Sequence, residues 1–480
     1  MPVHRREFIK KSAIAATAFY ILPRHVLGRG FIPPSDKLNI AAIGGGGKGH
    51  SDIINAWNNG TNNVVALCDI ELKRMDGVVS KFPKATKYTD FRVMLEKEKG
   101  IDAVTVSTPD HTHAVAAITA MQLGKHVYVQ KPLTHNIREA RMMTLAAKKF
   151  RVVTQMGNQG ASNPGVNKMV EWFDKGLIGK VAEVHVWTNR PVWPQGIPVP
   201  TGLHTVPQDI DWESWIGPAE WVDYNPAYHP FKWRGWWNFG TGALGDMGCH
   251  LIDAPYRVLG LGYPTEVECS VGAVYTRDWT PEWIPEGCPP SSIVQLKFGP
   301  SAKNKSRVNM TWSDGGIRPF QPDLIPAGEY AGDSDGSNGV IIVGSKGVMT
   351  CGTYGTNPRV YTNAGAKIEM TQDDKTPANL PEYGHNYAWT EACKAGFDSP
   401  QHKALTSSFD YAGPMTETVL MGNLAIRSYN LRHKRKDGGY DYPGRKKLTW
   451  DGSSMKITNF DEANQFVGRD NRKGWELPVI

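Results

Sequence analysis

The stretch from Leu38 to His50 constrains the fold of this chain more than any other part of it. The apolar run Leu38–Ile43 predicts a buried strand, and a cluster of glycines and a segment of helical character follow at once. Gly44, Gly46 and Gly49 fit the pattern G-x-G-x-x-G, which permits a tight turn, close approach of a pyrophosphate to the backbone, and close helix–strand packing. Because the chain has 50 glycines, the pattern alone is weak, and a glycine-rich surface loop is the alternative.

The residues around the glycines supply the context that the motif needs. A second strand is predicted over 63–67, and Asp69 follows it, about 20 residues beyond Gly49. A carboxylate at this place binds the hydroxyls of an adenosine ribose and repels the 2′-phosphate of NADP. Gly47 and Lys48, at the start of the helix, are further candidates for cofactor contacts. We therefore predict a dinucleotide-binding domain that prefers NAD to NADP.

Residues 36–158 continue this alternation of strands and helices, as a doubly wound parallel sheet requires. Further strands are predicted over 102–106, 126–129 and 152–155. Ligands of such sheets bind beyond the carboxyl ends of the strands. The residues at these ends are therefore candidates for cofactor or substrate contacts: Ser107, Thr108, Pro109 and His113, then Gln130 and Lys131, then Gln155.

The first 30 residues are expected to be a targeting segment. The pair Arg5-Arg6 is followed by Phe8, two lysines and a weakly apolar run over 12–22, as in a twin-arginine signal peptide. The run is too short to cross a membrane, so we expect no stable membrane insertion. This interpretation places the mature protein in the periplasm; an uncleaved basic arm would leave it in the cytoplasm.

Residues 159–450 are predicted to form a second domain, and 451–480 a polar tail. Alternating polarity predicts a second, mostly antiparallel open sheet, with strands over 181–187, 266–275, 292–298, 306–312, 340–343 and 347–351. Helices are expected over 246–259, 387–395 and 415–429. The Pro- and Trp-rich stretch 190–200 should be a loop, in which Arg190 and Trp193 are candidates for sugar contacts. The predicted fold class is α/β.

The composition argues against several classes of function. A net charge of +7 over 480 residues is small and the basic residues are dispersed, which disfavours nucleic-acid binding. The six cysteines include no C-x-x-C pair, so we expect buried free thiols and no metal site.

Two groups of residues could carry chemistry. Lys131 follows a strand and precedes a proline, where it can exchange a proton with a substrate hydroxyl or, alternatively, simply extend into solvent. Asp246, His250 and Asp253 have the i, i+4, i+7 spacing of one helix face, so a carboxylate can orient the histidine for acid–base chemistry. A buried structural histidine and a carboxylate–histidine metal site are the alternatives for this face.

Together these motifs resemble those of the Gfo/Idh/MocA family, which includes glucose–fructose oxidoreductase and inositol dehydrogenase. The resemblance extends from about residue 38 to 430 and rests on four motifs: G-x-G-x-x-G at Gly44–Gly49, the segment Ser107–His113, E-K-P at Gln130-Lys131-Pro132, and D-x-G-x-H-x-x-D at Asp246–Asp253. Gln130 stands where the family has glutamate, a residue that can tune the lysine and hold the cofactor ribose.

The resemblance implies a Rossmann domain followed by an α/β domain, and hydride transfer between a sugar or polyol carbon and tightly bound NAD. It gives Lys131, Asp246 and His250 catalytic roles and places the nicotinamide near Ser107–His113. We favour His250 as the base, oriented by Asp246 or Asp253. The expected substrate contacts are Lys131, Gln155, Arg190, Trp193, Asp246 and His250.

Relatives of this kind often form homo-oligomers through the open sheet, which we also expect here. Two alternative functions remain: a glycoside hydrolase or lyase-type enzyme that oxidises the sugar transiently with its bound cofactor, and a non-catalytic NAD-binding protein.

Overall fold

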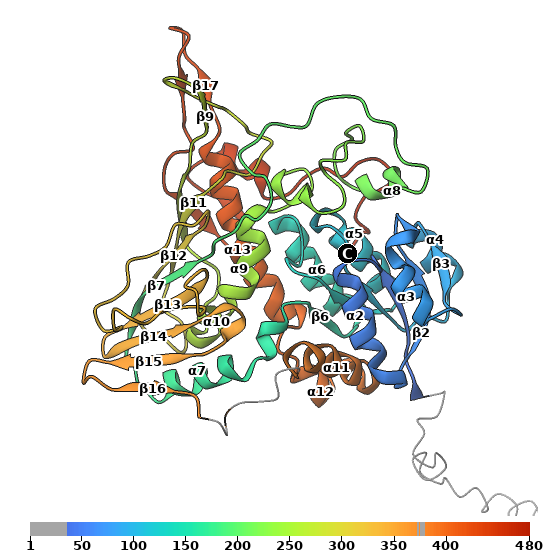
Figure 1. Cartoon of the computed structure of the whole chain (residues 1–480), viewed down its shortest axis with the longest axis horizontal. Helices are drawn as coiled ribbons and strands as arrows, with labels where there is room; N and C mark the ends of the chain where they lie inside the picture. The colour runs from blue at the N-terminus through green and yellow to red at the C-terminus, as the bar shows by residue number, and fades with distance from the viewer. Residues whose placement is uncertain (1–35, 372–373, 375–379) are drawn as a thin grey trace, which may run out of the picture.

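The computed structural model describes residues 36–371, 374 and 380–480. The predicted signal peptide over residues 1–30 lies outside this part of the chain. Within it, no helix is both long enough and apolar enough to cross a membrane. Figure 1 shows two sheets side by side, with the first domain at the right and the second sheet at the left.

The first domain is built on a six-stranded parallel sheet with the order β3-β2-β1-β4-β5-β6. The strands are β1 (Asn39–Ile43), β2 (Asn63–Cys68), β3 (Thr86–Tyr88), β4 (Ala103–Val106), β5 (His126–Val129) and β6 (Thr154–Met156). Its helices are α2 (Lys48–Trp57), α3 (Asp76–Lys81), α4 (Phe91–Lys97), α5 (His113–Gln122) and α6 (Ile137–Phe150). This is the doubly wound arrangement that the sequence predicts.

Both faces of this sheet are buried, which explains why its strands are continuously apolar. Ile40 and Ala42 of β1 belong to one apolar cluster, together with Ile53 of α2. Ala41 and Ile43 face the other way, into the large core that also contains α5 and α6. Of the strands in this sheet, only β3 was not predicted. Its three residues are too few to show a periodic pattern, and they are partly or fully exposed.

The second domain contains a ten-stranded sheet with the order β16-β15-β14-β13-β7-β12-β11-β8-β19-β20. Its strands are β7 (Val181–Trp187), β8 (Glu266–Val271), β11 (Ser292–Phe298), β12 (Val308–Ser313), β13 (Gly339–Gly344), β14 (Gly347–Cys351), β15 (Arg359–Thr362), β16 (Lys367–Glu369), β19 (Leu448–Asp451) and β20 (Lys456–Ile457). Only β7 and β12 pair in parallel. The prediction of a mostly antiparallel second sheet is confirmed.

Short hairpins and seven helices complete this part of the chain as described. The hairpins pair β9 (Tyr275–Arg277) with β10 (Thr280–Pro281) and β17 (His433–Lys434) with β18 (Tyr440–Asp441). The helices are α7 (Pro164–Asp174), α8 (Trp212–Ile216), α9 (Gly242–Leu251), α10 (Asp253–Leu259), α11 (Leu380–Ala395), α12 (Pro400–Lys403) and α13 (Phe409–Tyr429).

Helix α13 joins the two domains. It packs on α6 of the first domain and on α9 and β8 of the second (Figure 1). Arg141 of α6 forms a two-pronged ion pair with the buried carboxylate of Glu417, with both N–O distances 2.8 Å. The relative position of α9 and the first sheet is therefore fixed by a packed helix as well as by loops.

The helix predicted over 246–259 differs from the observed structure. It begins four residues earlier, at Gly242, and is divided at Ile252 into α9 and α10. Pro255 explains the division, because it has no N–H to donate to the carbonyl of Leu251.

Residues 190–240, which we call the aromatic strap, connect β7 to α9 by way of the first domain. As predicted, 190–200 contains no helix or strand. Further along, the strap builds its own small core, in which Trp212 and Trp215 stack with ring centroids 4.4 Å apart. In Figure 1 the strap, with α8, arches over the edge of the first domain.

The C-terminal tail returns to the first domain. The indole of Trp475 is buried, and the guanidinium of Arg92 lies 3.8 Å from its ring centroid. Arg472 donates to the main-chain carbonyl of Gly217 and pairs with Glu213 of α8. The tail therefore holds the strap from outside.

Candidate active site

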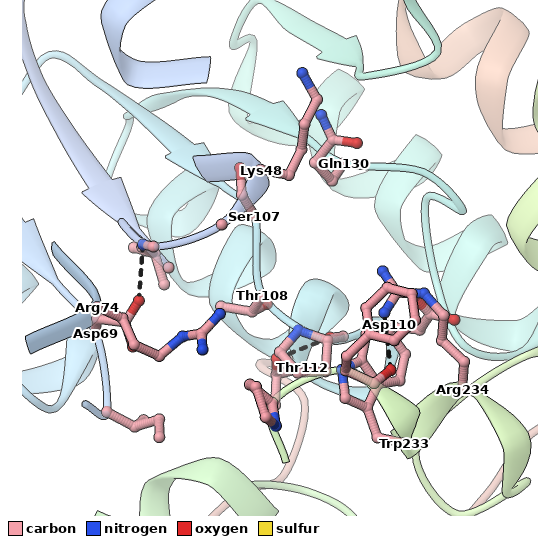
Figure 2. A pocket seen from close by; sticks show the side chains of 18 of the residues that line it. Lys48, Asp69, Arg74, Ser107, Thr108, Asp110, Thr112, Gln130, Trp233 and Arg234 are labelled. Atoms are coloured by element: carbon pink, nitrogen blue, oxygen red, sulfur yellow. Dashed lines mark hydrogen bonds between the residues drawn. The ribbon is translucent and has the colours of Figure 1, made fainter. Parts of the chain in front are cut away.

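One cavity of about 760 Å³ lies where the carboxyl ends of the first sheet meet α9 and the strap. Its size is that of a site for a cofactor or substrate. The residues on its wall come from both domains. The glycine turn of the first domain lines one end, and side chains of the second domain line the other. Figure 2 shows Asp69 and Arg74 at one end, and Asp110, Trp233 and Arg234 at the other.

The glycine turn forms the wall of the first end. Gly44 has φ +80°, and a Cβ on Gly49 would lie 1.8 Å from the carbonyl oxygen of Gly44. Only glycine therefore lets α2 begin this close to the end of β1. The N–H of Gly46 donates to Oδ2 of Asp69 over 2.9 Å, which ties the turn to the end of β2.

This end fits a dinucleotide. The turn at Gly44–Gly49 presents backbone and the start of a ten-residue helix, α2, and Gly46, Gly47 and Lys48 line the cavity. Asp69 lies where a ribose would be held; burial raises its pKa, against the hydrogen bonds from the N–H groups of Gly46 and Glu71. The Gly49 Cα lies behind the turn rather than on the cavity wall.

A buried carboxylate supports the middle of the cavity. Asp52 of α2 accepts hydrogen bonds from Ser107 Oγ at 2.7 Å and Gln130 Nε2 at 2.9 Å, and Lys48 Nζ lies 3.1 Å from its other oxygen. Burial raises the pKa of Asp52, and these partners oppose that effect. The side chain of Gln130, at the family's glutamate position, is thus anchored to a carboxylate that comes from the helix.

The other end is organised by Asp246. Lys131 Nζ lies 2.8 Å from both Oδ1 and the main-chain oxygen of Asp246, although the two residues are 115 positions apart. Arg234 Nε is 3.5 Å from the same Oδ1. Burial opposes ionisation of Asp246, but the charges of Lys131 and Arg234 outweigh it and lower its pKa to about 2. The two contacts with Asp246 fix the Lys131 side chain at the cavity wall.

His250 lies one helical turn after Asp246 and also lines the cavity. Burial, and then the charge of Lys131, hold its pKa well below the ordinary value, so the imidazole is neutral. Its Nδ1 has no hydrogen-bond partner in the described part of the chain. The ring of Tyr354 meets it edge-on, with centroids 4.7 Å apart.

Asp246 makes no hydrogen bond to His250 in the described part of the chain, and neither does Asp253, contrary to the expectation that one of them orients the imidazole. The Asp253 carboxylate accepts a hydrogen bond of 2.5 Å from the hydroxyl of Tyr411 and lies 3.2 Å from Arg257. Ile252, where α9 and α10 divide, keeps helical backbone angles (φ −69°, ψ −26°), so it is the contacts with Tyr411 and Arg257 that engage Asp253.

Besides Gly49, three predicted contacts are not brought to the cavity wall. His113 is buried, with its ring nitrogens against the carbonyl oxygens of Pro132 and Thr108. Gln155 is buried and donates to the carbonyl of His385. Trp193 is buried, and its Nε1–H donates to the side-chain oxygen of Gln195 in the same loop. The predicted residues that do line the cavity are Gly44, Gly46, Gly47, Lys48, Asp69, Ser107, Thr108, Pro109, Gln130, Lys131, Arg190, Asp246 and His250.

Several wall residues were not predicted as site residues. Arg74, Asp110, Trp233, Arg234 and Tyr354 all line the cavity. Asp110 lies in the strand-end segment 107–113, so its position could have been read from the sequence. Its carboxylate accepts a hydrogen bond from the Thr241 hydroxyl, and burial raises its pKa to about 6. Arg74 lies in a 3-10 helix, Leu72–Met75, just after β2, whereas Trp233, Arg234 and Tyr354 come from second-domain segments whose tertiary packing leaves no periodic signal in the sequence.

The side chains that commonly bind metal ions do not gather into a site in the described residues. In the described ranges, no group of three or more His, Cys, Asp or Glu side chains could hold a metal ion. The six cysteines are free, and five of them are buried.

Two protein-family models match this chain, one over each domain. Residues 38–158 match the model "Oxidoreductase family, NAD-binding Rossmann fold", and residues 168–278 match "Oxidoreductase family, C-terminal alpha/beta domain". These are the two domains of the Gfo/Idh/MocA oxidoreductase family. The Gfo/Idh/MocA resemblance read from the four sequence motifs is thereby confirmed for both domains.

Individual relatives are distant. A levoglucosan dehydrogenase of Pseudarthrobacter phenanthrenivorans is 27% identical over 257 residues, 51% of this chain and 55% of the relative. A glycosyl hydrolase family 109 protein of Shewanella baltica is 27% identical over 213 residues, 38% of this chain and 46% of the relative. The matched region thus spans about half the length of these curated relatives.

Solved dehydrogenase structures share the fold. An inositol dehydrogenase homologue from Azotobacter vinelandii, complexed with NADH and myo-inositol, has a TM-score of 0.55 at 17% identity, covering 80% of this chain and 93% of that one. Levoglucosan dehydrogenase in complex with NADH has a TM-score of 0.54 at 17% identity, covering 82% and 98%.

Proposed function

We propose that the protein is an NAD-dependent oxidoreductase that moves a hydride between a hydroxyl-bearing carbon of a sugar or polyol and the nicotinamide. The observation that carries this proposal is the pairing of a neutral histidine with a lysine ammonium on the cavity wall, at the end away from Asp69. Oxidation of an alcohol needs a proton acceptor and a stabiliser of the developing alkoxide, and these two groups supply both.

Each residue has a distinct role in the proposed reaction. Bound NAD supplies the hydride acceptor, held by the glycine turn and Asp69. His250, neutral because burial lowers its pKa, accepts the proton of the substrate hydroxyl. Lys131 donates a hydrogen bond to the same oxygen, and Asp246 fixes the direction of Nζ through two contacts of 2.8 Å. In the reverse direction His250 returns the proton.

NAD is preferred to NADP because the Asp69 carboxylate lies where a 2′-phosphate would approach. Arg74 lies beside Gly46 and Gly47 and adds positive charge at this end, which also suits a pyrophosphate. The preference therefore depends on the Asp69 carboxylate outweighing Arg74.

The strap supports retention of the cofactor. It is tied to the end of β2 by three contacts: the Asp211 N–H to the Ile70 carbonyl at 2.9 Å, His229 to Glu71 at 2.8 Å, and Lys73 to Asp209 at 2.6 Å. His229, with the two residues after it, lines the cavity at this end. A dinucleotide beneath these ties would leave slowly.

The first experiment is a chemical one. Purified protein is denatured, and any released nicotinamide cofactor is identified by mass spectrometry; sugars, polyols and glycosides are then screened for a change in absorbance at 340 nm. Reduction of NAD that is lost in the His250→Gln variant supports the proposal. Failure of every alcohol substrate to reduce NAD, with cofactor bound, contradicts it; if no glycoside is cleaved either, a non-catalytic NAD-binding protein remains.

A second function is favoured by the family 109 glycosyl hydrolase relatives and by the strap over the cofactor. In it, transient oxidation of a glycoside is followed by elimination of the aglycone alcohol, addition of water to the unsaturated sugar and re-reduction, so the glycosidic bond is hydrolysed without net reduction of NAD. Cleavage of a glycoside by loaded protein with no lasting change at 340 nm distinguishes this function from a dehydrogenase.

Export to the periplasm is proposed from the Arg5-Arg6 segment alone. We expect the loaded protein in the periplasmic fraction, and an Arg5→Lys, Arg6→Lys variant in the cytoplasm. A homo-oligomer is likewise proposed, and light scattering with size-exclusion chromatography tests it. An unchanged location of the variant contradicts the first proposal, and a monomeric mass contradicts the second.

A further inference from the structure

We propose that the substrate carries a carboxylate, as a uronic or aldonic acid unit does, and that Arg190 and Arg234 bind it. This inference rests on the proposed function in that it places the sugar at the Asp246 end of the cavity. It goes beyond that function because it names the charge of the substrate and the side chains that select it.

The wall of this end carries more positive than negative charge. The cations are Lys131, Arg190 and Arg234, and the carboxylates are Asp246 and Asp110. Asp110 has a pKa raised to about 6 by burial, so it adds a full negative charge only above that pH. The balance is one positive charge above pH 6 and two below it, before the positive charge of an oxidised nicotinamide is counted.

The cofactor phosphates do not account for this excess. Lys48, Arg74 and the start of α2 lie at the glycine turn, where the pyrophosphate fits. Arg190 follows β7 and Arg234 precedes α9, so both belong to the second domain. Lys131 and Arg234 both contact the Asp246 carboxylate, at 2.8 and 3.5 Å, and Arg190 lines the same cavity.

Arg190 has no carboxylate partner among the described residues. The one hydrogen bond of its guanidinium goes to the neutral amide oxygen of Asn189 over 2.6 Å. Its charge is nevertheless among the causes that lower the pKa of His250, so the guanidinium lies within electrostatic range of the proposed base. A guanidinium with free N–H groups at a cavity wall is suited to pair with a planar carboxylate.

Arg234 is held in place by aromatic rings. Its guanidinium carbon lies 4.3 Å from the ring centroid of Trp233 and 4.7 Å from that of Phe231, and Nη1 donates to the Phe231 carbonyl over 3.0 Å. Only Nε faces Asp246, at 3.5 Å, and Lys131 already neutralises that carboxylate at 2.8 Å. Figure 2 shows Arg234 beside Trp233 and Asp110. The rings fix its direction and leave its remaining N–H groups for a ligand.

The test measures binding apart from turnover. Full-length, NAD-loaded protein is titrated calorimetrically with the methyl glycosides of glucuronic, galacturonic and mannuronic acid, and with the matching neutral glucoside, galactoside and mannoside. We expect at least one uronide to bind about 10-fold or more tightly than its neutral partner, because a two-pronged Arg–carboxylate pair is charge-assisted. The advantage should shrink when NaCl is raised from low to near-molar concentration.

Variants identify the side chain. Arg190→Gln should lose most of the uronide preference, taken as the ratio of uronide to neutral-glycoside affinity within each variant, whereas Arg190→Lys should keep part of it. The control is Arg277→Gln, which removes the same charge from an exposed hairpin, where the Arg277 side chain is 72% exposed. Equal affinity for every uronide and its neutral partner overturns the inference, as does a preference that survives in both Arg190→Gln and Arg234→Gln.

The two proposals fail differently. If uronides bind with the predicted preference but absorbance at 340 nm never changes, the oxidoreductase proposal fails and the inference stands. If neutral sugars are oxidised and no uronide binds more tightly, the oxidoreductase proposal stands and the inference fails.

Discussion

Replacing Lys131 by methionine removes an ammonium while nearly preserving the length and apolar stem of the side chain. In the structure this ammonium contacts Oδ1 and the main-chain oxygen of Asp246, each at 2.8 Å. The variant leaves the carboxylate with one cation, Arg234, at 3.5 Å. The change therefore removes the better of two ion pairs without leaving Asp246 wholly unpaired.

The pKa of Asp246 sets the size of the effect on stability. It falls from 3.8 to about 2 on folding, which corresponds to roughly 2 kcal/mol at about 1.4 kcal/mol per pKa unit. Because a depressed carboxyl pKa stabilises the folded state above the unfolded pKa, this contribution is complete above about pH 5 and is lost as the pH falls towards 2. Since Arg234 retains part of it, Lys131→Met should lower the free energy of unfolding at pH 7 by about 1–2 kcal/mol.

The effect on catalysis should be larger. Loss of one charged donor to a developing oxyanion in an enclosed site typically lowers kcat by about 10²- to 10³-fold. NAD affinity should change little, because the cofactor is held mainly at the glycine turn. Urea unfolding between pH 3 and 8, single-turnover hydride transfer and NADH binding measure the three quantities in one preparation.

Lys125→Met is the matched control, because Lys125 precedes β5 and Lys131 follows it. The exposed Lys125 Nζ reaches only the main-chain oxygen of Lys99, so this variant should retain stability and turnover. The reasoning is refuted if Lys131→Met turns over within about 3-fold of the parent protein, far less than a lost oxyanion donor costs, or if its stability difference from the parent is the same at pH 3 and pH 7.

Three further predictions follow from the cavity. Gly49→Ala, whose Cβ would meet the Gly44 oxygen at 1.8 Å, should weaken NADH binding by roughly 10-fold or more; fluorescence titration measures this, and unchanged affinity contradicts it. Asp69→Asn should shift the NADP-to-NAD affinity ratio towards NADP by about 10-fold, because repulsion is removed and Arg74 remains; a constant ratio would show that Asp69 does not select the cofactor. Because burial raises the pKa of Asp110 from 3.8 to about 6, its ionisation should lower the free energy of unfolding by roughly 2 kcal/mol as the pH rises from 4 to 6. Urea unfolding curves of Asp110→Asn should lack this contribution and keep that of Asp314, whose pKa burial also raises to about 6.

The glycine turn and its strand were predictable because their causes are local. A run of apolar residues that ends in G-x-G-x-x-G restricts the backbone within a dozen positions, and Gly44 and Gly49 occupy the conformation and the contact that the motif implies. The alternation of strand and helix likewise implies a parallel sheet. Asp246 and His250 were predictable as neighbours because four residues span one helical turn.

The assignment of buried polar groups was not predictable in the same way. His113 and Gln155 have the residue types and strand-end positions of site residues, yet backbone carbonyls from other elements use their hydrogen-bonding groups. The Asp253 carboxylate, likewise, accepts a hydrogen bond from the hydroxyl of Tyr411 on another helix. A polar side chain that leaves water must find a partner, and that partner is chosen by whichever element packs against it.

The sequence by itself determined the two-domain α/β architecture, the dinucleotide turn and the identity of Lys131, Asp246 and His250, since each follows from residues close together in the chain. Only the tertiary structure decided that Lys131 and Asp246 meet across 115 positions, that the strap and tail close over the first domain, and that Arg190 and Arg234 bring positive charge to one end of the cavity. These features depend on contacts between distant segments, where charge balance and burial act over space and leave no periodic pattern in the sequence.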